Sequence, residues 1–137
     1  MNPAQHSNGH LLIFRSTDWH TGLSPEEIQS VMSDWTAWFE RLGAEGKLAG
    51  GNPLEREGHV VSGKNRSVSD GPFAESKEAV GGYFLLTVGS LEEAVEIAKE
   101  CPALPYGLTV EVRPVAPACP AERMRREAEA AAMSLKD

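Results

Sequence analysis

Cysteine, long apolar runs and clustered positive charge are all scarce in this sequence of 137 residues. The two cysteines, Cys101 and Cys119, have neither the density of a disulfide scaffold nor the close spacing of a redox or zinc motif. Every apolar run is far shorter than the roughly 20 residues that cross a bilayer as a helix. The formal net charge of −7 opposes a nucleic-acid-binding surface, because such a surface needs clustered Lys and Arg.

Histidine is also sparse, and its four copies lack the spacing of a local metal-binding motif. We therefore expect no metal site, and the lack of a phosphate-binding loop or nucleophile elbow predicts no cofactor. The first nine residues are polar, so we expect neither a secretion signal nor membrane attachment. Isolated cysteines in an acidic chain favour the cytoplasm.

Hydrophobic periodicity predicts one α+β domain over residues 10–116. We expect a flexible N-terminus at residues 1–9 and a helical extension at residues 117–137. Short runs with period-two alternation or bounding turn residues predict strands at residues 10–15, 47–54, 57–62, 66–69, 82–88 and 108–113. Paired glycines in the second of these indicate a bulge or a close backbone approach.

Two helices are marked by their caps. Ser24 and Ser90 each precede an apolar stripe and are followed three residues later by Glu27 and Glu93, the pattern of a capping box. The first helix is expected over residues 25–42, with Trp35 and Phe39 in the core and Trp38 at its edge; the second is expected to end at Pro102. Strands that flank these helices favour a split βαβ arrangement, with both helices on one face of an antiparallel sheet.

The most constrained segment is the turn Asp-Gly-Pro-Phe at residues 70–73, followed by Glu75, Lys77 and a Gly-Gly-Tyr strand start at residues 81–83. Asp can accept a backbone N–H across such a turn, Gly tolerates unusual dihedrals, and Pro fixes its own φ. Together with Gly46-Lys47-Leu48, the Cys101-Pro102 stop and the final strand at residues 110–114, this segment resembles the YCII-related, DGPF-domain proteins.

The resemblance covers about residues 10–115. It implies a ferredoxin-like fold that dimerises sheet against sheet to form a dimeric α+β barrel, with a site in the enclosed cavity. The YCII-type branch has a His/Asp pair proposed as an acid–base couple, and the helical position aligned with that His is Trp35 here. Proximity of related genes to extracytoplasmic-function sigma factors implies a sigma factor as a possible regulatory partner.

Asp70 and the loop residues Asp18 and His20 are candidates for proton transfer or ligand contact. Asp70 could act as a general acid or base, with Lys77 or Arg113 lowering its pKa, or could only tie down its turn. An imidazole two residues from a carboxylate suits proton transfer near neutral pH, although both groups could equally be solvated surface residues.

A further candidate set lies on the two best strands. Thr109, Glu111 and Arg113 alternate onto one strand face, and Tyr83 lies on the corresponding face of the preceding strand. Arg113 could hold an anion while Glu111 acts on a proton beside it; the alternative is a structural ion pair. His59 could line the same cavity or lie at a strand edge.

The sequence thus predicts a homodimer that binds a small molecule, with an anion among the candidates, or catalyses proton transfer in a sheet-face cavity. Asp70 and Glu111 are the catalytic candidates. The ligand-binding candidates are Arg113, Tyr83, Thr109, His20 and Asp18. The alternative is a non-catalytic regulatory or interaction module, and the sequence leaves open whether the protein is an enzyme.

Overall fold

The computed structural model describes residues 8–16, 18–71, 79–117 and 120–134. Its elements in chain order are β1 (His10–Arg15), α1 (Pro25–Ala44), β2 (Leu48–Pro53), β3 (His59–Ser62), β4 (Ser67–Asp70), β5 (Val80–Leu86), α2 (Leu91–Ala98), a short 3-10 turn (Leu104–Tyr106), β6 (Thr109–Pro114) and α3 (Pro120–Ser134). The predicted mixed α+β class is confirmed. Of the constrained turn, residues 72–78 lie outside the described residues, including Glu75 and Lys77.

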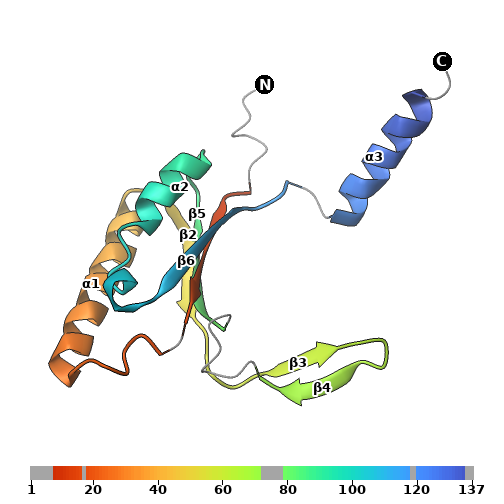
Figure 1. Cartoon of the computed structure of the whole chain (residues 1–137). Coiled ribbons are helices and arrows are strands. Elements are labelled where there is room, and N and C mark those ends of the chain that lie inside the picture. Colours follow the sequence, from red (N-terminus) through yellow and green to blue (C-terminus); the bar gives the residue numbers. More distant parts are fainter. Residues whose placement is uncertain (1–7, 17, 72–78, 118–119, 135–137) are drawn as a thin grey trace.

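Four strands form an antiparallel sheet in the order β2–β5–β1–β6, while β3 and β4 form a separate two-stranded sheet. The segments β1–α1–β2 and β5–α2–β6 each place one strand at the centre and one at an edge. Both helices cover the same face of the four-stranded sheet (Figure 1). The opposite face, called the open face below, has no helix packed on it in Figure 1.

The core lies between the two helices and the covered face of the sheet. Alternation along the central strands buries Leu12 and Phe14 of β1 and Phe84 and Leu86 of β5. The helices meet these side chains with an apolar set spaced three, four or seven residues apart within each helix: Val31, Trp38, Leu42, Ala94, Ile97 and Ala98. Burial of each large side chain contributes about 1.5–3 kcal/mol.

Both predicted helix starts are confirmed. The Ser24 hydroxyl accepts the Glu27 N–H at 3.2 Å and the Glu27 carboxylate accepts the Ser24 N–H at 3.0 Å, which is a complete capping box. The Ser90 hydroxyl accepts the Glu93 N–H at 3.1 Å. The α-helical part of α2 ends at Ala98, before the predicted stop at Pro102, because the chain tightens into i→i−3 bonds such as Cys101 N–H to Ala98 O.

The predicted roles of two aromatic residues on α1 are wrong. Trp38, expected at the helix edge, is 4% exposed, whereas Phe39, expected in the core, is 36% exposed. Trp38 lies seven residues after Val31 and four before Leu42, on the stripe that faces the sheet. Phe39 is the next residue, so the helix rotates its side chain away from this stripe. The buried Trp38 indole N–H donates to the Glu100 carboxylate at 3.2 Å.

Two appendages extend away from this core (Figure 1). The β3–β4 hairpin projects beyond the sheet, and Val61 and Val68, paired across it, remain exposed. Helix α3 stands clear of the sheet and of the other helices. No helix within the described ranges is both long and apolar enough to cross a membrane.

Candidate ligand-binding site

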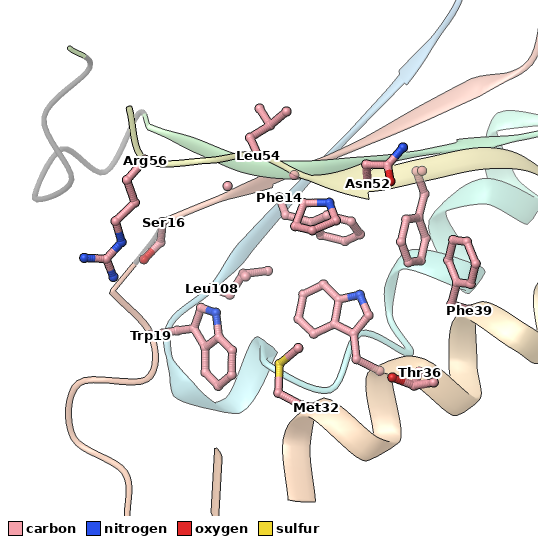
Figure 2. A pocket seen from close by; sticks show the side chains of 16 residues that line it. Phe14, Ser16, Trp19, Met32, Thr36, Phe39, Asn52, Leu54, Arg56 and Leu108 are labelled. Atoms are coloured by element: carbon pink, nitrogen blue, oxygen red, sulfur yellow. The ribbon is translucent and has the colours of Figure 1, made fainter. Parts of the chain in front are cut away.

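A cavity of about 460 Å³ lies between α1 and the covered face of the sheet. This volume falls within the roughly 300–1,000 Å³ of typical small-molecule sites. Figure 2 shows that its walls come from α1, the central strands, β2 and the loop after β1. Its lining residues are Phe14, Ser16, Trp19, Met32, Trp35, Thr36, Phe39, Gly51, Asn52, Pro53, Leu54, Arg56, Gly81, Gly82, Phe84 and Leu108.

Five of the sixteen lining residues are aromatic. Helix α1 contributes Met32, Trp35, Thr36 and Phe39, which are spaced three or four residues apart and so share one helix face. The Phe14 ring of β1 packs edge-to-face against Trp35, with centroids 5.0 Å apart. Phe14 makes a second edge-to-face contact with Phe84 at 4.9 Å, and Phe39 contacts Phe84 from the helix at 5.3 Å. These interlocked rings give the cavity a rigid, apolar wall.

In the sheet wall of the cavity, glycines allow the backbones of β2 and β5 to approach each other closely. Gly51 of β2 lies across from Phe84 of β5, and a Cβ at Gly51 would come within 2.6 Å of the Phe84 ring and 2.7 Å of the Tyr83 carbonyl oxygen. At Gly82 a Cβ would meet the Asn52 carbonyl oxygen at 3.0 Å. The register of β2 against β5 also shifts between Leu48 and Gly50, which confirms the predicted irregularity in this strand.

One end of the cavity is polar. Figure 2 shows Ser16, Trp19 and Arg56 at the end away from Phe39. Ser16 has a φ of 87°, rare for a residue with a side chain, and its N–H donates to the Ala79 carbonyl at 3.0 Å. The Ser16 hydroxyl donates to the Asp18 carboxylate at 2.6 Å. Left-handed backbone of this kind concentrates at ligand-binding and catalytic positions.

His20 and Arg56 meet at the same end. The Arg56 Nη2 lies 3.4 Å from His20 Nε2, and the His20 ring packs against Trp19 with centroids 5.8 Å apart. A guanidinium can only donate, so Nε2 is the acceptor in this contact. Arg56 carries the one charge among the described lining residues, and within the described part of the chain it forms no ion pair.

The structure separates the residues predicted from sequence into three places. Asp18 and His20 are not among the described lining residues of the cavity, but they contact two residues that are, Ser16 and Arg56. Asp70 lies on the exposed hairpin, 3.2 Å from His59 Nδ1, and His59 is an exposed strand residue. Asp70 therefore belongs to the separate two-stranded sheet, and Thr109, Glu111 and Arg113 belong to the four-stranded one (Figure 1).

The strand candidates lie on the open face. Ile13 of β1 pairs with both Tyr83 and Glu111, so these two side chains share the face opposite Phe14 and Phe84. The Glu111 carboxylate accepts from Arg15 Nε at 2.8 Å and lies 3.6 Å from Arg113 Nε. Thr109 is opposite Arg15 on the same face. The ion pair foreseen as the alternative role of Glu111 is present, and Arg15 is the partner that sequence reasoning missed.

Arg56, Trp19 and Ser16 were also missed as site residues. Arg56 follows a strand in a charged segment and has no motif around it, whereas Trp19 is adjacent to the candidates Asp18 and His20. An aromatic residue between two polar candidates was the available signal. Across the described ranges, no three His, Cys, Asp or Glu side chains gather closely enough to hold a metal ion.

These features define a small α+β domain with a ligand-sized aromatic cavity between its first helix and its sheet. The model of the YCII-related domain family matches residues 10–118, and the chain belongs to that family. An uncharacterized protein of Rhizobium meliloti (strain 1021) is 36% identical over 101 residues, which cover 68% of this chain and 79% of the relative.

Proposed function

We propose that this protein binds a small, largely apolar molecule in the cavity between α1 and the sheet. The observation that carries the proposal is a cavity of about 460 Å³ walled by aromatic rings and ending at polar groups. Burial of an apolar ligand body against these rings supplies affinity, and a few convergent polar groups fix its orientation.

His20 is the proton carrier of this proposal. Its imidazole contacts the lining residue Arg56 through Nε2, and imidazole is the side chain best suited to exchange protons near neutral pH. Asp18, two residues before His20 in the chain, accepts a hydrogen bond from the Ser16 hydroxyl. Neither His20 nor Asp18 is among the described lining residues, so a ligand at this end would meet the Arg56 cation directly and would exchange a proton with His20 once Nε2 leaves Arg56.

The protein further acts as a homodimer in this proposal. The strand order β2–β5–β1–β6 is that of a ferredoxin-like split βαβ fold, which supports the dimeric α+β barrel implied by the family. On the open face, Leu11, Ile13, Tyr83 and Leu85 are half-buried around the Arg15–Glu111 pair. A mixed surface of this kind suits an isologous interface that encloses a second, wetter cavity.

Native mass spectrometry of freshly purified protein tests assembly and ligand together. We expect a dimer, and a bound small molecule would appear as an added mass. The variant Leu85→Glu, placed on the open face, is expected to shift the population to monomer, while Glu96→Gln at an exposed position of α2 leaves it unchanged. A monomer at micromolar concentration in the unmutated protein would overturn the dimer.

Filling the cavity tests the site. Thr36→Phe adds a large ring to an exposed residue that lines the cavity, and Ser33→Phe adds the same ring to an exposed position of α1 outside the described lining. Binding of 2-naphthamide, a flat neutral probe, is followed by isothermal titration calorimetry. We expect Thr36→Phe to abolish binding and Ser33→Phe to preserve it; equal binding by both variants would overturn the cavity as the site.

A second candidate function is a regulatory or interaction module. Its support is the β3–β4 hairpin, because an isolated two-stranded hairpin with exposed Val61 and Val68 has little stability of its own. A sigma factor is the partner suggested by family resemblance alone. Affinity purification that recovers a stoichiometric partner from wild type but not from Val61→Thr/Val68→Thr would support this function; recovery of no stoichiometric partner would count against it.

A further inference from the structure

We propose that the cavity selects a planar aromatic anion, with its ring beside Trp19 and Trp35 and its negative group on Arg56. This inference rests on the proposed function and adds the chemical class of the ligand. It is drawn from two features of the cavity, the mutual orientation of two indoles and the position of one charge. Each feature is tested separately below.

The two indoles favour a flat ligand. The rings of Trp19 and Trp35 are nearly parallel, with an interplanar angle of 26°, and their centroids are 6.4 Å apart. Face-to-face carbon atoms in direct contact lie about 3.5–4.0 Å apart, so the indole faces are not packed closely centre over centre. Near-parallel walls match a flat ring better than a branched or chair-shaped body, because the whole face of a flat ring gains contacts.

Trp19 can adjust to such a ring. It lies in the loop between β1 and α1 and is half-buried, whereas Trp35 is fixed on a helix and by the Phe14 ring at 5.0 Å. Trp35 is therefore held by secondary structure, and Trp19 is held by a loop. A ring held between two faces needs about 7 Å between them, twice the direct contact distance, so a ring inserted beside Trp35 requires Trp19 to move aside.

The charge at the polar end favours an anion. Arg56 is the one charged residue in the described lining, and Glu55 and Glu57, its neighbours in the chain, form no ion pair with it within the described residues. Asp18, the nearby carboxylate, accepts from the Ser16 hydroxyl instead. A planar guanidinium without a carboxylate partner is suited to bind one bidentately.

A cationic ligand is disfavoured by the same residues. No described lining residue carries a negative charge, and a buried cation without a partner is costly. Arg56 is an exposed residue, so its guanidinium stays hydrated beside a neutral ligand and gains an ionic partner only from an anion. The lining thus distinguishes ligands by charge as well as by shape.

Three probes of similar size separate shape from charge. The anion 2-naphthoate is flat, decahydro-2-naphthoate carries the same charge on a non-planar body, and 2-naphthamide is flat and neutral. We expect isothermal titration calorimetry to show at least tenfold tighter binding of 2-naphthoate than of either other probe. Equal affinity for 2-naphthoate and 2-naphthamide would overturn the role of Arg56 and with it this inference.

Variants assign the two preferences to residues. Arg56→Gln is expected to remove the preference for 2-naphthoate over 2-naphthamide, while Arg66→Gln, a matched change in the exposed hairpin turn, preserves it. Trp19→Leu is expected to remove the preference over decahydro-2-naphthoate. Loss of the charge preference in Arg113→Gln instead of Arg56→Gln would place the anion on the open face and overturn the inference.

Failure of the underlying site has a different outcome. If none of the three probes binds at millimolar concentration, or if binding persists in Thr36→Phe, the cavity is not the ligand site and both proposals are wrong. If 2-naphthamide binds in a Thr36-sensitive manner but 2-naphthoate binds no tighter, the proposed function stands and the ligand class alone is wrong.

Discussion

Gly51 of β2 lies directly opposite Phe84 of β5, so close that a Cβ on the glycine would lie 2.6 Å from the Phe84 ring and 2.7 Å from the Tyr83 carbonyl oxygen. The phenyl ring could turn away, but the carbonyl belongs to the strand backbone. We therefore expect Gly51→Ala to push β2 from β5 and lower the free energy of unfolding by about 1–3 kcal/mol, measured by urea denaturation.

Gly50 provides the matched control for this substitution. It is the preceding residue of the same strand, and a Cβ there would meet nothing within 4 Å. Gly50→Ala is expected to be neutral or to stabilise the fold by about 0.5 kcal/mol, because alanine reduces the freedom of the unfolded chain. Equal destabilisation by both substitutions would contradict the close approach at Gly51.

The capping box of α1 predicts a dependence on acid. Hydrogen bonds from the Ser24 backbone N–H and hydroxyl lower the pKa of Glu27 below its ordinary 4.5. A carboxyl whose pKa is lower in the folded state stabilises the fold above the unfolded pKa, and this contribution is lost as pH falls through the folded pKa. Glu27→Gln should therefore show a smaller loss of stability between pH 7 and acid than wild type, measured by urea denaturation at each pH.

Glu26→Gln controls for the general effect of removing a carboxylate from the first turn. Glu26 precedes Glu27 on α1, and no hydrogen bond joins its side chain to Ser24 among the described residues. If both variants flatten the acid dependence equally, the bond to Ser24 is not its source.

Cys101 is expected to be chemically inert in the folded protein. Burial raises the pKa of its thiol to about 11, against the opposing effect of backbone hydrogen bonds at Ala103 and Leu104, and the side chain is 3% exposed. Reaction requires the thiolate and access, and both are scarce here. Iodoacetamide at pH 8 should modify Cys101 slowly in native protein and rapidly in guanidinium chloride, as followed by mass spectrometry.

The alkylation experiment uses the background Cys119→Ser, so that Cys101 is the thiol that reports; Cys119 lies outside the described residues.

The raised pKa of Cys101 also predicts how stability depends on pH in alkaline solution. The folded state holds its proton where the unfolded thiol has lost it, so stability should fall as pH rises above about 9, the ordinary value. Equally fast alkylation of native and unfolded protein would contradict the burial.

The Arg15–Glu111 pair has a modest expected effect on stability. The Arg15 Nε donates to Glu111 at 2.8 Å, with both side chains about one-third exposed. Glu111→Gln should lower the free energy of unfolding by up to about 1 kcal/mol in dilute buffer and by less in 1 M salt, since solvent and ions screen the pair. Glu96→Gln, which breaks the more exposed pair with Lys99, should cost less; a larger cost would contradict this order.

The main sheet and its two covering helices could be predicted from local chemistry. Strand β1 has the predicted bounds, and α1 begins at Pro25 as its serine cap indicates, because these signals depend on neighbours in the chain. The orientation of α1 was harder to predict. Both Trp38 and Phe39 fit an apolar stripe, and the sheet that α1 covers decides which of them is buried.

The site was predicted less well because it depends on segments far apart in the chain. Asp18 and His20 could be named as candidates from their place on a loop, but Arg56, the residue that His20 contacts, comes from the connection after β2, 36 residues away. The prediction for the open face placed Thr109, Glu111 and Arg113 together by alternation, and the register confirms it. The ion pair of Glu111 with Arg15 depends on the pairing of β6 with β1, and alternation within one strand does not predict that pairing.

The position of the β3–β4 hairpin divides the chain into two interlocking pieces. Residues before it supply β1, α1 and β2, and residues after it supply β5, α2 and β6, yet β5 lies between β2 and β1 in the sheet. A cut in the hairpin turn, where Lys64 and Arg66 are exposed to trypsin, would therefore sever no pair of the main sheet. Each of the two fragments would carry one of the two central strands, β1 or β5, so neither fragment alone contains the centre of the sheet.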